Sequence, residues 1–468
     1  MRTLIRGGHV IDPCTHLDSM VDILIDAGKI AAIGPDAIEM AWPREESALP
    51  TPLEVIAAHG LLVVPGLIDL HTHLREPGYE YKESIETGSA AAVAGGFTSI
   101  ACMANTNPVN DDAAVTEYIL DKARAVGLVQ VFPIGAISVG LEGKHLAEIG
   151  ELKQAGVVGI SDDGKSVMSS QLMRRALEYA GMFGLPVISH CEETDLAAHG
   201  VMHEGRVSTE LGLRGIPAQA EDIMVARDIA LAELTGGRLH IAHVSTAGAV
   251  RLVHDAKARG LRVTAEVTPH HLFLTDEAVR GYDPNTKMYP PLRTAADVEA
   301  LRQALRDGTI DAIATDHAPH DLADKEVEFD QAPVGIIGLE TSLPLTLRLV
   351  NEGILPLADA IAQLTWGPAQ VLGLPKGTLQ VGADADVTLI DTQTEYVVDR
   401  REFRSKSRNS PFHGWTLKGR AVMTIRAGTI VHSRMPEQVT YMSAPEGERR
   451  TRGRRGRETP GADGKEST

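Results

Sequence analysis

The stretch LLVVPGLIDLHTH at residues 61–73 decides the fold, because a long apolar run ends there in two histidines. Residues 61–70 have the length and the β-branched content of a buried strand. Side chains two residues apart on a strand point to the same side, so His71 and His73 face one way at its carboxyl end. Two imidazoles placed in this way can share a metal ion.

Seven further apolar segments follow the first one, and helical segments separate them. These predicted strands are residues 98–103, 129–137, 157–160, 187–189, 239–242, 263–267 and 312–314. Between two of them, Leu172, Ala176 and Ala180 repeat at the spacing of one helical face. Eight strands that alternate with helices predict an α/β fold, a closed (β/α)8 barrel of the TIM type.

The two ends of the chain have a different pattern. Residues 3–33 are typical of short strands with glycine turns, and β-type runs return at 385–391 and 421–430. We expect residues 1–58 and 376–440 to form one small β-sandwich domain beside a barrel of residues 59–375. The arginine-rich segment 446–468 predicts a disordered basic tail, with a basic docking arm as the alternative.

The composition favours an enzyme that acts on a small molecule. The chain has 468 residues and a formal net charge of -18, which disfavours binding to nucleic acid or to an anionic membrane surface. No apolar stretch has the length of a membrane span, and the N-terminus lacks a signal-peptide core. Three widely spaced cysteines predict neither a disulfide framework nor a cysteine zinc cluster. We therefore expect a cytoplasmic protein.

Polar residues also follow the other predicted strands, and the carboxyl ends of barrel strands meet at one mouth. These residues are Asp162, Asp163, His190, Glu192, His243, Asp316 and His317. So many buried titratable groups need either partners or cations. Imidazoles and carboxylates without a thiolate suit zinc, or less selectively manganese or cobalt. The sequence therefore predicts a metal-dependent hydrolase.

Six motifs connect the chain with known enzymes: PGLIDLHTHLREPG at 65–78, SDDG at 161–164, TPHHL at 268–272, PPLR at 290–293, ATDHAPH at 314–320 and SRNSPF at 407–412. Through them, residues 3 to 434 resemble the dihydroorotases of the amidohydrolase superfamily, of the bacterial type in which an aspartate bridges two metal ions. The resemblance implies reversible, zinc-dependent hydrolysis of the cyclic amide of (S)-dihydroorotate to N-carbamoyl-L-aspartate, a step of pyrimidine biosynthesis.

The resemblance also implies a role for each site residue. The implied ligands of two zinc ions per subunit are His71, His73, Asp163, His190, His243 and Asp316. Asp163 would bridge the ions, with Asp162 as the alternative, and Asp316 would also act as catalytic base and acid. The implied substrate-binding residues are His73, Arg75, Asn105, Tyr289, His320, Val334 and Gly335. The planar guanidinium of Arg75 can bind both oxygens of a substrate carboxylate.

One position departs from the family pattern, because Tyr289 stands where asparagine is usual. A phenol can donate a hydrogen bond, but it lacks the paired groups of an amide. The long, charged segment 321–333 after Asp316 predicts a mobile lid.

Two alternative interpretations stay open. One is another cyclic-amide hydrolase of the hydantoinase or allantoinase type, and the other is a non-catalytic partner of aspartate carbamoyltransferase. The complete ligand set disfavours the second. For an active enzyme we expect a homodimer, with association with aspartate carbamoyltransferase as a further expectation.

Overall fold

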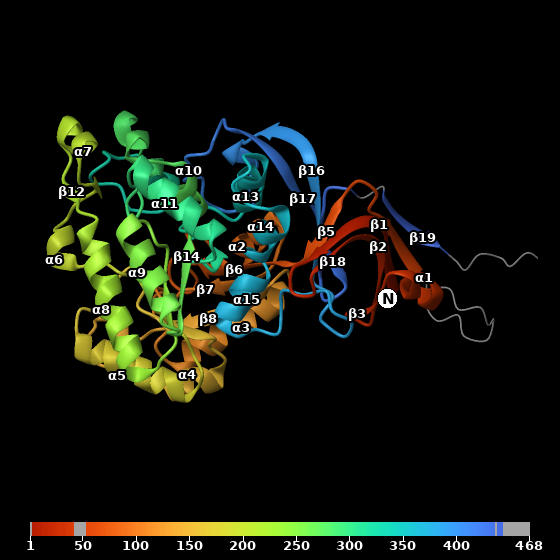
Figure 1. The fold of residues 1–468 in the computed structure, drawn as a ribbon, viewed down its shortest axis with the longest axis horizontal. Coiled ribbons are helices and arrows are strands. Elements are labelled where there is room, and N and C mark those ends of the chain that lie inside the picture. Colours follow the sequence, from red (N-terminus) through yellow and green to blue (C-terminus); the bar gives the residue numbers. More distant parts are fainter. Residues whose placement is uncertain (1, 42–52, 436–437, 443–468) are drawn as a thin grey trace, which may run out of the picture.

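The computed structural model describes residues 2–41, 53–435 and 438–442. It consists of a barrel surrounded by helices and, beside the barrel, a sheet built from both ends of the chain (Figure 1).

Eight parallel strands form the barrel. They are β6 Leu67–Thr72, β7 Phe97–Cys102, β8 Gln130–Gly135, β9 Gly159–Ser161, β10 Val187–Ser189, β13 Leu239–Ile241, β14 Val263–Val267 and β15 Ala312–Ile313. Each pairs with its neighbour in this order, and a parallel bridge between Thr72 and His317 joins the two ends of the sheet. The predicted (β/α)8 barrel is therefore confirmed as a near-closed barrel.

Helices on the outside cover these strands (Figure 1). The longer ones are α2 Ile85–Gly95, α3 Ala113–Val126, α4 Ile149–Ala155, α5 Ser170–Met182, α8 Gln219–Thr235, α9 Ala247–Ala258, α11 Ala295–Arg306, α13 Ser342–Asn351, α14 Leu357–Ala362 and α15 Trp366–Leu372. Helix α5 buries Ala176 and Ala180, as the spacing predicts, and the Ser169 side chain caps its first turn. Among the described residues, no helix is long and apolar enough to cross a membrane.

Short elements follow three of the strands and extend one end of the barrel. After β10 come α6 Thr194–Ala197, β11 Met202–His203, α7 Arg206–Leu211 and β12 Gly215–Ile216; after β14 comes α10 Pro269–Phe273, and after β15 comes α12 Leu322–Lys325. Because they start where parallel strands end, these segments surround the barrel mouth at which the polar strand ends meet.

The second unit is a nine-stranded mixed sheet. Its strands are β1 Arg2–Asp12, β2 Leu17–Asp26, β3 Lys29–Ile33, β4 Leu53–Ala57, β5 Leu62–Pro65, β16 Val387–Val397, β17 Thr416–Arg426, β18 Thr429–Ser433 and β19 Val439–Met442, and α1 Pro35–Ala41 follows β3. Strands from both chain ends lie side by side, so the predicted small domain of both ends is confirmed. The domain boundaries stay a prediction, and the predicted tail 446–468 lies outside the described residues.

The predicted first strand, residues 61–70, is two strands in the structure. Strand β5 pairs with β1 and β16 in the outer sheet, whereas β6 belongs to the barrel. Gly66 separates them at a point where a Cβ would lie 2.1 Å from Oγ1 of Thr98. The chain changes sheets at this close approach. The sign of the change in the sequence is the Pro65-Gly66 pair, which interrupts the apolar run.

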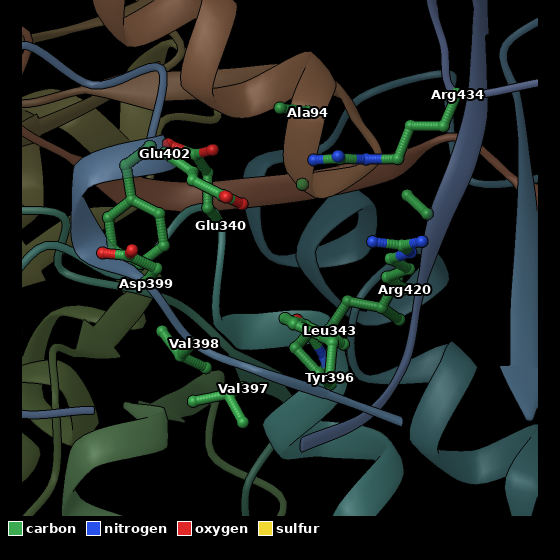
Figure 2. Close-up of a pocket in the computed structure, with 14 residues that line it drawn as sticks. Ala94, Glu340, Leu343, Tyr396, Val397, Val398, Asp399, Glu402, Arg420 and Arg434 are labelled. Carbon is green, nitrogen blue, oxygen red and sulfur yellow. The ribbon is translucent and has the colours of Figure 1, made fainter. Parts of the chain in front are cut away.

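A polar pocket lies at the junction between barrel and outer sheet (Figure 2). Arg420 and Arg434 contribute to its lining from the sheet side, together with the carboxylates of Glu340 and Glu402. Burial raises the pKa of Glu340 to about 7, and its Oε1 accepts the backbone N–H of Arg404 at 2.7 Å. None of the residues lining this pocket is a predicted site residue, so the candidate site lies elsewhere.

Candidate metal centre

His71 and His73 stand at the end of β6 and turn toward the same two carboxylates. Nε2 of His71 lies 3.5 Å from Oδ1 of Asp163 and 3.5 Å from Oδ1 of Asp316. Nε2 of His73 lies 3.4 Å from Oδ2 of Asp163 and 2.9 Å from Oδ1 of Asp316. All four side chains are buried. The period of two along a strand thus places both imidazoles as the sequence predicts.

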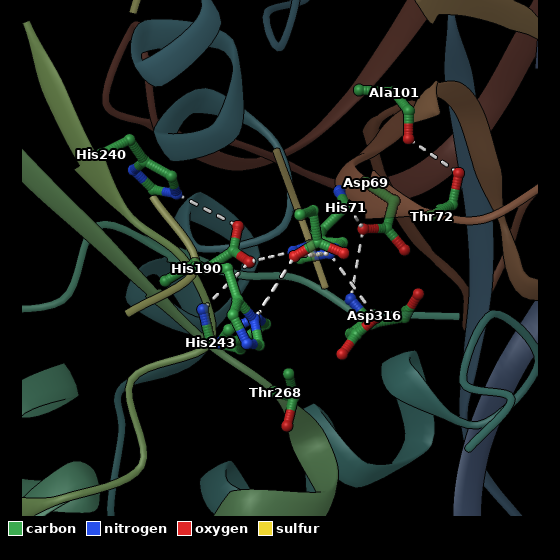
Figure 3. A network of polar contacts seen from close by, with 12 residues as sticks. Asp69, His71, Thr72, Ala101, His190, His240, His243, Thr268 and Asp316 are labelled. Carbon is green, nitrogen blue, oxygen red and sulfur yellow. Dashed lines mark hydrogen bonds and ion pairs between the residues drawn. The ribbon is translucent and has the colours of Figure 1, made fainter. Parts of the chain in front are cut away.

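The other two predicted histidines approach Asp163 from the ends of β10 and β13. Nδ1 of His190 lies 3.7 Å and Nε2 of His243 3.4 Å from Oδ1 of Asp163. The two ring nitrogens are 2.9 Å apart. Figure 3 shows His71, His190, His243 and Asp316 gathered around one centre. Asp163 is therefore the residue that both pairs of histidines share.

Asp162, the alternative bridging residue, points elsewhere. Its Oδ1 accepts the backbone N–H groups of Ile137 at 2.8 Å and Ser138 at 3.0 Å, and its Oδ2 accepts the Ser138 hydroxyl. These bonds tie Asp162 to the segment after β8. Of the two neighbouring aspartates, only Asp163 reaches the histidines.

The chemistry of the cluster fits metal ions. Among the described residues, nothing forms a hydrogen bond with the buried Nε2 of His71 or the buried Oδ1 of Asp163, which is costly for polar atoms that nothing else satisfies. Three sets have ligand atoms within 4.8 Å of one another: His71, His73 and Asp163; His71, His243 and Asp316; and Asp163, His190 and His243. Because the sets overlap, the residues fit a centre with two ions.

The charges of the cluster support the same conclusion. Burial alone lowers the pKa of His71, but Asp316 and Asp163 raise it well above its ordinary value. Burial alone raises the pKa of Asp163 and Asp316, but His71 holds both well below the ordinary range. Both carboxylates therefore stay ionised, as metal ligands must be. A divalent ion would supply the positive charge that a protonated His71 otherwise provides.

Two further residues orient the histidines of β6. Nδ1 of His71 lies 2.6 Å from Oε1 of Glu266, and Nδ1 of His73 lies 2.9 Å from Oδ1 of Asn105. When each Nδ1–H donates to the oxygen of Glu266 or Asn105, each Nε2 keeps a lone pair that faces the centre. Glu266 is not among the residues predicted from the sequence, although it is a lone carboxylate in the apolar strand β14. For Asn105 only a substrate role was predicted, without the bond to His73.

The predicted site residues surround one pocket of about 330 Å³. It is lined by His73, Arg75, Asn105, Asp163, Gly164, His190, His243, Met288, Tyr289, Asp316, Ala318, His320, Pro333, Val334 and Gly335. His71 is the one predicted site residue outside this lining, and it is fully buried behind the cluster. The pocket thus opens directly onto the candidate ligands.

Arg75 presents a cationic group to this pocket. Its Nε donates to the carbonyl of Pro319 at 3.2 Å, while its terminal nitrogens form no ion pair within the described part of the chain. The backbone φ of Arg75 is 62°, and Asp316 and His243 also have positive φ values of 46° and 34°. Such conformations are unusual for residues other than glycine and are typical of functional sites. Two donors of the guanidinium are thus available to an anion.

Tyr289 contributes its ring to the pocket and turns its hydroxyl away. The hydroxyl donates to the carbonyl of Gly200, in the loop between α6 and β11. Burial raises the pKa of Tyr289 to about 12, so the phenol stays protonated. While this bond exists, the hydroxyl cannot donate to a ligand in the pocket.

His320, Val334 and Gly335 lie together on the opposite wall. Burial, with the nearby charges of Arg75 and Lys82, lowers the pKa of His320 to about 2. The neutral ring accepts from Lys82 at Nδ1, 3.2 Å away, and donates from Nε2 to the carbonyl of Val334 at 2.8 Å. Gly335 donates its N–H to the carbonyl of Lys287. Among the described residues, nothing accepts the N–H of Val334, so this donor is available to a ligand.

Three other reactive side chains of the region stay outside the cluster. His271 bonds to Oγ1 of Thr268 at 2.7 Å and to the carbonyl of Pro290 at 2.9 Å. His270 is buried beside it, and burial lowers its pKa to about 3. Burial also raises the pKa of the Cys191 thiol well above its ordinary value, so Cys191 is no nucleophile.

Known proteins with similar sequences are dihydroorotases. A dihydro-orotase-like family matches residues 60–249, and an amidohydrolase family matches residues 207–432. The chain is 56% identical over 432 residues to a dihydroorotase of Syntrophus aciditrophicus (strain SB), covering 92% of this chain and 99% of that one. It is 57% identical over 434 residues to a dihydroorotase of Geobacter sulfurreducens, covering 93% of this chain and all of the relative.

Solved structures with the same architecture include hydantoinases and dihydropyrimidinases. The L-hydantoinase (dihydropyrimidinase) from Arthrobacter aurescens matches with a TM-score of 0.79 and 28% identity, covering 92% of this chain and 96% of that one. The dihydropyrimidinase from Brevibacillus agri NCHU1002, at 24% identity and a TM-score of 0.77, shares the fold. Sequence identity of 56% over nearly the whole length shows the family as well as the fold. The chain belongs to the dihydroorotase family of the amidohydrolase superfamily.

Proposed function

We propose that this dihydroorotase hydrolyses the ring amide of (S)-dihydroorotate reversibly to N-carbamoyl-L-aspartate at a centre of two zinc ions. The observation that carries the proposal is the position of Arg75. Its guanidinium has unpaired nitrogens in the same pocket as the candidate ligands. A cyclic amide that also carries a carboxylate on its ring fits this combination.

The proposed ligands are His71, His73 and Asp316 for one ion and His190 and His243 for the other, with Asp163 between them. Imidazoles and carboxylates without a thiolate support zinc. Zinc at such a centre supplies Lewis acidity, which lowers the pKa of a water from about 15.7 towards 7 and polarises a carbonyl group.

Three residues are proposed to hold the substrate. Arg75 binds the substrate carboxylate through its two free nitrogens. Asn105 adds its amide N–H, because its Oδ1 is already bonded to His73. Val334 offers its free backbone N–H to a ring oxygen. The ring of Tyr289 and the neutral side chain of His320 close the pocket around the substrate, with Gly335 beside them.

Asp316 is the proposed proton carrier. Its Oδ1 lies 2.9 Å from Nε2 of His73, at the centre of the cluster. It accepts a proton as water attacks the amide carbon, and it returns that proton to the amide nitrogen when the C–N bond breaks. One residue acts first as base and then as acid for this proton. The second proton of the water is released to the solvent when the new carboxyl group of the product ionises.

We also propose the cellular setting of the protein. The described cysteines Cys14, Cys102 and Cys191 are all free, which supports a reducing cytoplasm. A homodimer and association with aspartate carbamoyltransferase remain predictions, and native mass spectrometry of the purified chain and of a mixture with that enzyme tests them.

A substrate panel tests the function against the hydantoinase alternative. Wild type is expected to hydrolyse dihydroorotate far faster than dihydrouracil, hydantoin or allantoin, which carry no carboxylate. Arg75→Gln is expected to lose about 10 to 100-fold in kcat/KM for dihydroorotate, since charge-assisted hydrogen bonds contribute about 1.5–3 kcal/mol. Arg259→Gln, on the outside of the barrel, serves as the control. Faster turnover of hydantoin than of dihydroorotate would contradict the proposal.

A further inference from the structure

Glu266 is a fully buried carboxylate near the end of β14 that contacts both halves of the candidate metal centre. Its Oε1 lies 2.6 Å from Nδ1 of His71 and accepts the backbone N–H of His243 at 3.2 Å. Its Oε2 lies 3.1 Å from Nε2 of His240. Figure 3 shows His71, His243 and His240 around this network.

We propose that Glu266 is a positioning residue that sets the zinc affinity of both metal sites at once. The inference rests on the ligand assignment proposed above, and it goes further by coupling the two sites through one carboxylate. Glu266 would touch neither ion, because it acts on a ligand side chain in one half and on a ligand backbone in the other.

In the first half, Glu266 fixes the ring of His71. Glu266 accepts a hydrogen bond from Nδ1–H, so Nε2 carries the lone pair of the ring. Nε2 is also the atom that lies 3.5 Å from Oδ1 of Asp163 and from Oδ1 of Asp316. The negative charge also makes the imidazole a better electron donor. Without Glu266 the buried Nδ1–H would lose its acceptor, and the tautomer protonated at Nε2, which cannot bind a metal through Nε2, would become competitive.

In the second half, Glu266 holds the backbone of His243. This residue has a φ of 34°, which L-residues rarely adopt and which costs free energy unless bonds hold it. The N–H of His243 donates to the same Oε1 that serves His71. In that conformation Nε2 of His243 lies 3.4 Å from Oδ1 of Asp163. One oxygen atom therefore orients a ligand on each side of Asp163.

His240 fixes the carboxylate itself. It is fully buried, and its Nδ1 lies 2.9 Å from Oγ1 of Thr264 while Nε2 contacts Oε2 of Glu266. With Oε2 held in this way, rotation of the carboxylate away from His71 and His243 would break three bonds together. His240 is thus part of the support although it lies outside the candidate ligands.

The test compares metal binding of Glu266→Gln with wild type. Metal-free proteins are titrated with zinc in competition with a chromophoric chelator, and with ¹¹³Cd followed by NMR. The amide of the variant keeps the size of Glu266 but holds only one acceptor oxygen. Both zinc dissociation constants are expected to rise, each by about 10 to 100-fold, and both cadmium resonances to shift.

Two further variants keep the test decisive. Asp228→Asn removes a buried charge beside Ser189 that contacts no candidate ligand, and it is expected to leave both affinities unchanged. His240→Gln keeps Glu266 and weakens its support, so both affinities should fall together by a smaller factor. A loss confined to one site, or an equal loss in Asp228→Asn, would overturn the inference. Fewer than two zinc ions on the wild-type chain would overturn the proposed metal centre as well, so the two failures are distinguishable.

Discussion

Tyr289 occupies the pocket in a way that its residue type alone does not reveal. The ring lines the pocket, and the hydroxyl is bonded to the carbonyl of Gly200. A substrate in this pocket would therefore meet an aromatic face at the position where the resemblance to the family implies an amide. The donors proposed for the substrate are Arg75, Asn105 and the N–H of Val334, and all three residues line the pocket.

Tyr289→Phe is expected to change KM for dihydroorotate by less than about 2-fold, because the lost hydroxyl is not free to bind substrate. The same variant should lose about 1 kcal/mol of stability, the usual net contribution of one hydrogen bond. Steady-state kinetics and urea unfolding measure the two quantities. Tyr289→Asn is the comparison, since it restores the usual amide but removes the ring. A tenfold rise in KM for Tyr289→Phe would show that the hydroxyl serves the substrate.

The candidate ligands could be predicted from the sequence, but the residues that support them could not. Each candidate ligand follows a predicted apolar strand, and strand ends of a barrel converge. His240 and Glu266 lie inside the predicted strands 239–242 and 263–267 rather than after them. A search for polar residues after the predicted strands does not find these two, because their role depends on which strands are neighbours in space.

At the scale of elements, the segment 321–333 is fastened to its surroundings by lysines. Nζ of Lys325 donates to the carbonyls of Pro284 and Pro333 at 2.8 Å each, and Nζ of Lys287 donates to the carbonyl of Asp330 at 2.9 Å. That this segment moves as a lid stays a prediction. Faster hydrogen exchange there than in the barrel strands, slowed by substrate, is the expected result.

Lys325, in this segment, makes the free energy of unfolding depend on pH. Burial, with the charge of Lys287, lowers its pKa from 10.5 to about 7 in the folded protein. Between these two values the unfolded chain binds more protons than the folded one, so this group makes stability rise with pH. The stability of wild type minus that of Lys325→Met is therefore expected to increase from pH 7 to pH 9 in urea unfolding. A difference that is constant or that decreases would contradict the assignment.

Helices and strands could be predicted from the sequence where an apolar stretch or an apolar helical face has clear ends. Strand β10 has the predicted bounds, and α5 buries the predicted face. Apolarity does not reveal the change from β5 to β6, because Val63 and Ile68 are equally apolar on either side of it, and the Pro65-Gly66 pair marks a break without showing that the two strands join different sheets. Which sheet a strand joins is decided by its hydrogen-bond partners, and those lie far away in the chain.

For the whole molecule, the metal centre connects strands from all around the barrel. Its candidate ligands come from the ends of β6, β9, β10, β13 and β15, so bound ions would hold five strand ends together. The shared fold with hydantoinases at 28% identity shows that the framework alone does not select the substrate. The residues proposed to hold the substrate at the barrel mouth are the candidates for that distinction.

Removal of the metal is expected to destabilise the whole barrel. A ligand that binds only the folded state stabilises it by about 2.7 kcal/mol when its concentration is 100 times Kd. Treatment with a chelator should therefore lower Tm by several degrees, and added zinc should restore it. Calcium, which prefers oxygen ligands, should not restore it. Calorimetry measures Tm after each treatment. A Tm that the chelator does not change would contradict a structural contribution of the ions.

The proposed zinc-dependent hydrolysis is tested by measuring bound metal and dihydroorotate hydrolysis in the same preparations of wild type and Asp316→Asn. We expect about two zinc ions per wild-type chain together with turnover. The variant is expected to lose at least about 100-fold in kcat, since the proposed role of Asp316 is both to transfer the proton and to bind an ion. Wild type with two bound ions and no turnover of dihydroorotate would contradict the proposed function.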